Sequence, residues 1–363
     1  MDKAVIVKAK RTIIGKQNGV LRSFGAEQLA APLISHLGEE MEIDDVILGN
    51  VVGPGGNIAR LSALQAGLPF SVPGVTIDRQ CGAGLEAIRM ACHLIQGGAG
   101  TCYIAGGTES TSTSPFEKRA RFSPEEIGDP DMGMAAENVA KKYNITKDMQ
   151  DEYAALSYAR TLAAREKGYL QEEILPLPNT PFEDETINLR MNYEKIIRRA
   201  RPAFMQNGTV TAANSCGVND GACAVLVMAE REARRLGYKP ILRFVDSAVA
   251  GVSPHLPGIG PVHAVHKLLK KTGVMMEEIT IVELNEAFAA KIVACTQELQ
   301  IPYEKLNCNG GAIALGHPYA ASGAMLVTRL FYEAKRSQVR YAIAALGIGG
   351  GIGLALLFEG VSV

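Results

Sequence analysis

A cysteine between a short apolar run and a helical pattern is the first candidate for chemistry in this sequence. Cys81 stands in the run 78–84 (DRQCGAG). At the first turn of a helix, a cysteine lies near the positive end of the helix dipole and near unpaired backbone N–H groups, which lowers the pKa of its thiol. Gly82 and Gly84 would let a substrate or another backbone come close. On these local grounds Cys81 is either a reactive nucleophile or a tightly packed small residue.

A histidine framed by glycine and proline is the second candidate. His317 ends the run 310–318 (GGAIALGHP), at the start of another helical pattern. If its turn lies beside the Cys81 turn, the imidazole could accept the thiol proton and pair with the thiolate. The alternative is a histidine that only caps a helix.

Two further segments could support such a pair. Asn285 follows an apolar run and could cap the next helix or direct its amide at an active-site water. The run 347–351 (GIGGG) offers backbone N–H groups without side chains in the way, and with the N–H of Cys81 these could form an oxyanion hole. A glycine run alone is weak support, since turns also need glycine.

The elements that would position these residues recur in two halves of the chain. In the first half we expect strands at 4–7, 45–49, 75–77, 101–105 and 221–229, and helices at 26–36 and 81–95. In the second half we expect strands at 241–249, 280–283, 304–308, 340–346 and 353–358, and helices at 260–271, 286–299 and 322–335. This alternation predicts an α/β fold of two similar modules with strands buried on both faces.

The first half carries about 110 additional residues that the second lacks, roughly 109 to 219. Within them we expect helices at 135–143 and 147–168, followed by an irregular, charged stretch at 175–205. Insertions at the carboxyl ends of strands often bind substrate in α/β folds. We therefore predict three parts: residues 1–108 with 220–236, the inserted subdomain 109–219, and residues 237–363.

Composition limits the class of protein. The chain has 363 residues, a formal net charge of −1 and 47% hydrophobic residues. This balance gives no support for binding nucleic acid or a membrane surface. The seven cysteines show no metal-binding or CxxC spacing, so we expect no metal site, free thiols and a cytoplasmic setting. Cys92, Cys102, Cys223 and Cys295 lie in apolar runs and are predicted to be buried.

The motifs as a set resemble the thiolase family. The resemblance rests on 79–85 (RQCGAGL), 285–288 (NEAF), 309–318 (NGGAIALGHP) and 349–351 (GGG), with support from 132–140 (MGMAAENVA) and 217–222 (GVNDGA). It extends over essentially the whole chain, in order. It implies duplicated βαβαβαββ modules that form a layered αβαβα core, with an inserted loop subdomain in the first module.

The resemblance also implies an acyltransferase that acts on acyl-CoA thioesters. Cys81 would accept the acyl group, His317 would activate it, Asn285 would hold a water of one oxyanion hole, and Gly349 would complete the other. The acyl group would pass to CoA or to the α-carbon of a second acyl-CoA. Coenzyme A would be substrate or product, with no tightly bound cofactor, and the protein would be a homodimer or homotetramer.

The same resemblance suggests residues that contact the acyl-CoA. Candidates are Met132, Cys216 and Phe288, and for the CoA phosphates and adenine Arg190 and the arginines of 198–201, each of which could instead be a solvated surface residue. Cys216 departs from the family, which often has a serine there.

One departure touches the chemistry itself. Where the family usually has a second catalytic cysteine, this chain has Gly347. Glycine can neither remove a proton from an α-carbon nor activate a CoA thiol, so we expect thiolysis and condensation to be impaired and Gly347→Cys to raise thiolysis at least about tenfold. Cys308 could substitute, although a buried structural role is the simpler interpretation. The alternatives to a transferase are an acyl-CoA-binding paralogue that has lost turnover, acting as a sensor or complex subunit, and an acyl-CoA hydrolase.

Overall fold

The strands of both halves join in one mixed sheet. The computed structural model describes residues 2–115 and 119–361. Within this part the strands follow the order β4 (Gly74–Ile77), β3 (Asp45–Gly49), β5 (Cys102–Glu109), β6 (Asn219–Ala229), β1 (Ala4–Arg11), β7 (Leu242–Gly251), β10 (Ile352–Gly360), β9 (Tyr341–Ile348) and β8 (Ile279–Leu284). The short β2 (Gly15–Lys16) pairs with β6. A two-residue antiparallel contact between β1 and β7 joins the halves.

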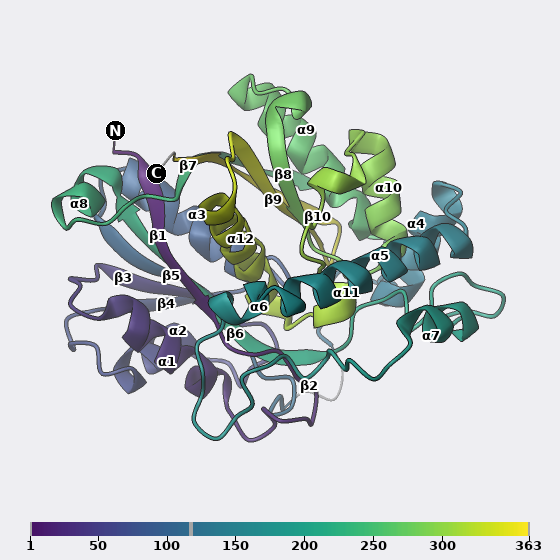
Figure 1. Ribbon diagram of the computed structural model, residues 1–363, viewed down its shortest axis with the longest axis horizontal. Coiled ribbons are helices and arrows are strands. Elements are labelled where there is room, and N and C mark those ends of the chain that lie inside the picture. Colours follow the sequence, from purple (N-terminus) through teal and green to yellow (C-terminus); the bar gives the residue numbers. More distant parts are fainter. Residues whose placement is uncertain (1, 116–118, 362–363) are drawn as a thin grey trace.

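Helices make three layers around the two halves of this sheet (Figure 1). α3 (Ala83–Gln96) and α12 (Tyr319–Arg336) pack on each other in the middle layer, where α12 contacts both β5 and β9. α1 (Ala26–Gly38) and α2 (Ile58–Gln65) cover the outer face of the first half. α9 (Gly260–Thr272) and α10 (Ala289–Leu299) lie on the outer side of the second.

Alternation along single strands explains the layering. In β5, Cys102 and Ile104 belong to the core under α1, whereas Tyr103 and Ala105 belong to the central core with α3 and α12. In β9, Ile343 and Ala345 face the outer core, and their neighbours in the strand face the central one. Successive side chains of a strand point to opposite faces, so an almost wholly apolar strand can bury both.

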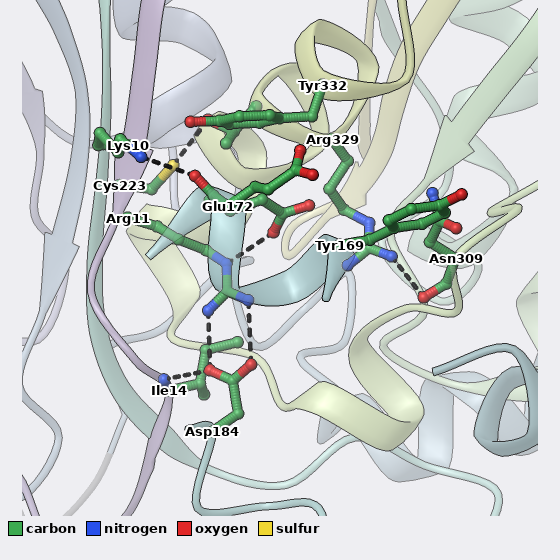
Figure 2. Close-up of polar contacts among 12 residues, drawn as sticks. Lys10, Arg11, Ile14, Tyr169, Glu172, Asp184, Cys223, Asn309, Arg329 and Tyr332 are labelled. Carbon is green, nitrogen blue, oxygen red and sulfur yellow. Dashed lines mark hydrogen bonds and ion pairs between the residues drawn. The ribbon is translucent and has the colours of Figure 1, made fainter. Parts of the chain in front are cut away.

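The segment between β5 and β6 folds over the middle layer and carries α4 (Met132–Lys142), α5 (Lys147–Glu166), α6 (Tyr169–Glu173) and α7 (Tyr193–Arg199). Buried ion pairs hold it to β1. Arg11 donates to Glu173 at 2.8 Å and to both carboxylate oxygens of Asp184 at 2.7 and 3.0 Å (Figure 2). This bidentate pairing fixes the direction of the segment as it leaves α6.

Most predicted elements form, with corrections at the ends and at one strand. The strand expected at 304–308 is wrong: a 3₁₀ turn, η3 (Tyr303–Lys305), occupies its start, and Leu306 makes one bridge to Val282. The helix expected from 286 begins at Ala289, because Phe288 is extended at φ −147° and ψ 139°. The stretch 175–205 is irregular except for α7.

Candidate active site

The first turns of the two central helices touch through their backbones. A Cβ built on Gly84 would lie 2.3 Å from the carbonyl oxygen of Ala320, and one built on Gly107 would lie 2.1 Å from the same oxygen. Only glycine allows an approach this close. Cys81 and His317 each precede the contacting residue of their helix by three positions. The duplicated plan therefore brings the two turns that carry them to the same place in the middle layer.

Cys81 differs from our expectation in its electrostatics. The residue is a free, partly buried cysteine that stands two positions before α3, which begins at Ala83 with Gly82 as its N-cap. Burial raises the pKa of the Cys81 thiol to about 11, and the positive charge of Lys291 only partly opposes this effect. The prediction that this pKa is lowered at the helix start is wrong, since the effect of burial outweighs those of Lys291 and of the local backbone hydrogen bond. The resting sulfur is therefore a neutral thiol at physiological pH.

His317 is suited to accept such a proton. The residue is buried, and burial followed by the charge of Lys291 lowers the pKa of its imidazole to about 3, so the ring is neutral. Its Nδ1 lies 2.6 Å from Oγ of Ser322, and its backbone N–H donates to Asn219 at 2.9 Å. In the tautomer whose Nδ1–H donates to Ser322, Nε2 keeps a free lone pair.

Asn285 carries an unused hydrogen-bond donor. Its side chain is buried, and its Nδ2 atom has no partner among the described residues. It lines a cavity of about 20 Å³ together with Gly316 and Ser322, the residues around His317. A volume of this size holds one water molecule. An unpaired buried amide beside a water-sized cavity is the arrangement expected for a group that holds a water next to the histidine.

Glu286 fixes the loop that presents Asn285. Its carboxylate accepts hydrogen bonds from Tyr153 at 2.6 Å, Ser157 at 2.6 Å and Asn307 at 2.8 Å. Two of these donors lie on α5, so the segment over the site is tied directly to this loop. A Cβ on Gly311 would lie 2.3 Å from the carboxyl carbon of Glu286, which also holds the turn before His317.

Gly349 lies against the Cys81 turn and under an aromatic ring. A Cβ on Gly82 would lie 2.4 Å from Cδ1 of Ile348, which places the glycine turn after β9 beside Cys81. A Cβ on Gly349 would lie 2.8 Å from the ring of Phe122, a residue of the segment between β5 and β6. The arrangement is consistent with an oxyanion hole made from the N–H groups of Gly349 and Cys81.

Three residues singled out in the sequence converge on one small cavity. Met132, Phe288 and Gly347 line a space of about 10 Å³ together with Lys291 of α10. Sequence analysis missed Lys291. The signal was present, because a lysine stands within the apolar run of 289–295 where the helix should be buried on that face.

Glu109 is a second residue that sequence analysis did not assign. Its buried carboxylate, at the end of β5, accepts from the backbone N–H groups of Val52 at 3.0 Å and Ala320 at 3.2 Å. Burial raises its pKa to about 7. The contact with Ala320 links β5 to the first turn of α12, so Glu109 positions the turn that carries His317.

The candidate CoA contacts are only partly gathered. Cys216 is partly buried and donates its backbone N–H to Ala287 at 3.0 Å, next to the Asn285 loop. An open groove of about 690 Å³ on the segment between β5 and β6 is lined by two of the predicted arginines, Arg199 and Arg201, and by Lys195. Arg190 is exposed and lies outside the residues that line this groove.

Cys308 gains no support as a substitute thiol. Its Sγ donates to the carbonyl of Glu304 at 3.2 Å. Burial raises its pKa to about 11, and the charges next to it are those of Glu283 and Arg160, which do not line the cavity at Gly347. The other four cysteines predicted to be buried are buried. Among the described residues no cluster of histidine, cysteine or acidic side chains could hold a metal, and no helix is long and apolar enough to cross a membrane.

The turns that carry a thiol and a neutral imidazole meet through the contact of Gly84 with Ala320. These residue types are the ones that cysteine-dependent acyl transfer uses. Family models agree: the thiolase N-terminal domain matches residues 4–231 and the thiolase C-terminal domain matches 238–360. The chain belongs to the thiolase family.

Individual relatives cover the full length. "Putative acetyl-CoA C-acetyltransferase YhfS" of Bacillus subtilis (strain 168) is 60% identical over 98% of this chain and 99% of its own. "Putative acetyl-CoA C-acetyltransferase VraB" of Staphylococcus aureus (strain MRSA252) is 48% identical over 99% of both chains. The crystal structure of the Bacillus anthracis acetyl-CoA acetyltransferase matches with a TM-score of 0.93 and 36% identity over 99% of both chains. The predicted thiolase fold is thereby confirmed.

Proposed function

We propose that this protein transfers acyl groups, in the manner of an acetyl-CoA C-acetyltransferase, through an acyl-Cys81 intermediate. The observation that carries the proposal is the contact between Gly84 and Ala320, which sets the turns of Cys81 and His317 side by side. The names of the full-length relatives support acetyl-CoA as the substrate class.

In this mechanism Cys81 starts as a neutral thiol and His317 as a neutral imidazole, and a proton passes between them as the acyl-enzyme forms. Nε2 of His317 takes the thiol proton while Sγ of Cys81 attacks the thioester carbonyl. The negative charge on the carbonyl oxygen is met by preorganised donors. A water held by Nδ2 of Asn285 forms one oxyanion hole with His317, and the N–H groups of Cys81 and Gly349 form the other. The orphaned amide of Asn285 supports this role.

The acyl-CoA is proposed to enter under the segment between β5 and β6. Met132 and Phe288 would contact the acyl end, Cys216 the pantetheine arm, and Arg199 and Arg201 the phosphates, because these arginines line the open groove. Arg190 stays a weaker candidate. Coenzyme A acts here as substrate and product, and the proposal includes no tightly bound cofactor.

Gly347 stands where two-cysteine thiolases would carry the thiol for the second proton transfer. We therefore propose that thiolysis and condensation are slower than in a two-cysteine thiolase, while acylation of Cys81 persists. A paralogue that only binds acyl-CoA would not acylate, and a hydrolase would lose the acyl group at a rate independent of CoA.

One experiment tests the proposal against both alternatives. Wild-type protein and Cys81→Ser are incubated with acetyl-CoA, the acetyl adduct is followed by intact mass, and CoA is then added. We expect a single adduct on the wild type, none on Cys81→Ser, and discharge that CoA accelerates. A wild-type protein without an adduct would reject the proposed function. Loss at equal rates with and without CoA would identify a hydrolase.

We further propose that the protein is cytoplasmic and forms a homo-oligomer, and that each subunit has the three parts given above. The edge strand β4 is only partly buried, and Leu61, Leu64 and Phe70 next to it are exposed, Phe70 at 89%. An uncovered edge with apolar neighbours is suited to pairing with a second copy. Light scattering after size exclusion would find a dimer or tetramer, and Phe70→Glu should shift it toward monomer.

A further inference from the structure

Lys291 is a buried amine without a partner. Its residue is 3% exposed, and among the described residues no hydrogen-bond acceptor reaches its Nζ atom. A charged, unpaired ammonium in such a place is costly, and a neutral amine costs much less. Natural proteins seldom keep this arrangement without a use, and buried lysines are a common source of general bases.

The amine of Lys291 lies near Gly347, the position where the second catalytic thiol is missing. Lys291 and Gly347 line the same small cavity with Met132 and Phe288. The contacts run in sequence: a Cβ on Gly347 would lie 3.4 Å from Cα of Gly258, and a Cβ on Gly258 would lie 2.9 Å from Cβ of Lys291. Only the Gly258 backbone therefore separates the stem of the lysine from Gly347.

Its surroundings connect it to the reacting groups. The titratable groups that act on Lys291 are Cys295 one turn further along α10, Cys81 before α3, Cys216 in the loop before β6, and Glu286 in the Asn285 loop. Lys291 is also the charge that acts on His317. Burial lowers the pKa of Lys291, and these groups oppose that effect only in part. The amine is therefore closer to neutrality than a surface lysine at physiological pH.

We infer that Nζ of Lys291 is the acid–base group of the second half-reaction. It would take the role that a cysteine at position 347 has in two-cysteine thiolases. This inference rests on the proposed function, because it needs an acyl-Cys81 intermediate. It assigns a catalytic role to a residue outside the motifs that identify the family, and it gives a use to an amine that is buried beside Gly347.

The proton balance closes over one cycle. In condensation, neutral Lys291 removes a proton from the α-carbon of the second acyl-CoA. The carbanion attacks the carbonyl of acyl-Cys81, a C–C bond forms, the C–S bond breaks, and Cys81 leaves as a thiolate. The Lys291 ammonium then passes its proton to this thiolate, which restores the neutral amine and the thiol. In thiolysis the ammonium returns a proton to the departing carbanion. The neutral amine then takes the proton of a CoA thiol, whose sulfur attacks acyl-Cys81 and releases Cys81 as a thiolate. His317 returns to this thiolate the proton that it took when Cys81 attacked.

Exchange of the α-proton isolates this step. Full-length protein is incubated with acetyl-CoA in D₂O, and deuterium in the acetyl group is followed by mass spectrometry beside the Cys81 adduct. We compare wild type with Lys291→Met, which keeps the stem without the amine, and Lys291→Gln, which keeps a polar end. Lys267→Met, at an exposed lysine of α9, is the matched control.

Removing the base should lower exchange about 10²–10⁴-fold in both Lys291 variants. Acylation should change less than about tenfold, because a thiolate is a good leaving group and its departure needs no proton from Lys291. Equal loss of exchange and acylation would mean a structural role and overturn the inference, as would unchanged exchange. Wild type that acylates without exchange would also overturn it. Wild type that does not acylate would instead reject the proposed function.

Discussion

Nδ1 of His317 lies 2.6 Å from Oγ of Ser322, five residues later in the first turn of α12. The hydroxyl holds Nδ1 of the ring, so this hydrogen bond leaves Nε2 free to act as a base. The histidine is thus oriented by the same helix whose start it precedes, and its position does not depend on a flexible partner.

Ser322→Ala should slow acylation of Cys81 about tenfold, because a hydrogen bond that orients the base contributes about 1–1.5 kcal/mol. Ser322→Thr keeps the hydroxyl and should retain more activity. Stopped-flow release of CoA from acetyl-CoA measures the rate. Ser337→Ala, which removes an exposed bond to the carbonyl of Glu333, is the control and should behave as wild type. An unchanged rate in Ser322→Ala would mean that another group orients the ring.

The thiol of Cys81 should titrate late. Because burial raises its pKa to about 11, the thiolate fraction, and with it the rate of alkylation by iodoacetamide, should still rise about tenfold per pH unit between pH 8 and 10. Peptide mapping of the Cys81 adduct at each pH gives the rate. Acylation by acetyl-CoA should vary far less over this range, since neutral His317 takes the proton. A plateau of alkylation below pH 8 would contradict the effect of burial.

Asn285→Ala should separate catalysis from folding. Removing one oxyanion-hole donor typically lowers kcat about 10²–10³-fold. The Nδ2 atom has no hydrogen bond to the part of the chain that the structure describes, so the free energy of unfolding should change by less than about 1 kcal/mol. Steady-state kinetics and urea unfolding provide the two measurements. A large loss of stability with little loss of rate would assign Asn285 to the fold.

Gly347→Cys should not restore a two-cysteine enzyme, contrary to the expectation from sequence. A Cβ at this position would lie 2.6 Å from the carbonyl oxygen of Pro257, which is backbone and cannot turn aside. Overpacking of this kind costs about 1–3 kcal/mol, and thiolysis should not increase. Gly251→Ala, where a Cβ meets nothing within 4 Å, is the control for stability. Faster thiolysis in Gly347→Cys would show that the loop at Pro257 moves readily.

Arg11→Met should detach the segment between β5 and β6 from the sheet. Its guanidinium is 1% exposed and pairs with Glu173 and Asp184, so removal leaves two buried carboxylates unpaired and should cost about 3–5 kcal/mol. Arg235→Gln, which breaks an exposed pair with Glu232, should have no measurable effect. Denaturant midpoints compare the two, and limited proteolysis should cut the segment first in Arg11→Met.

The strands and helices followed from local pattern where a run was long and apolar. The expected bounds of β3 are those observed, and the ends of most other strands shift by one to a few residues. The strand expected at 304–308 did not form because only Leu306 and Cys308 of this run are apolar, and a turn is enough to bury Leu306. The sequence alone identified the family because each of its motifs is a contiguous run of residues. Such a run can be recognised without knowledge of the fold.

By itself, the sequence predicted Cys81, His317 and Asn285 as site residues and showed a glycine at position 347, since each stands in a contiguous motif. The tertiary structure decided two further things. It reversed the expected pKa shift of Cys81, because desolvation depends on residues packed from distant parts of the chain. It also brought Lys291 of α10 to the small cavity beside Gly347 of β9. These residues are 56 positions apart in sequence, and they share a cavity only because the chain folds α10 and β9 into the same core.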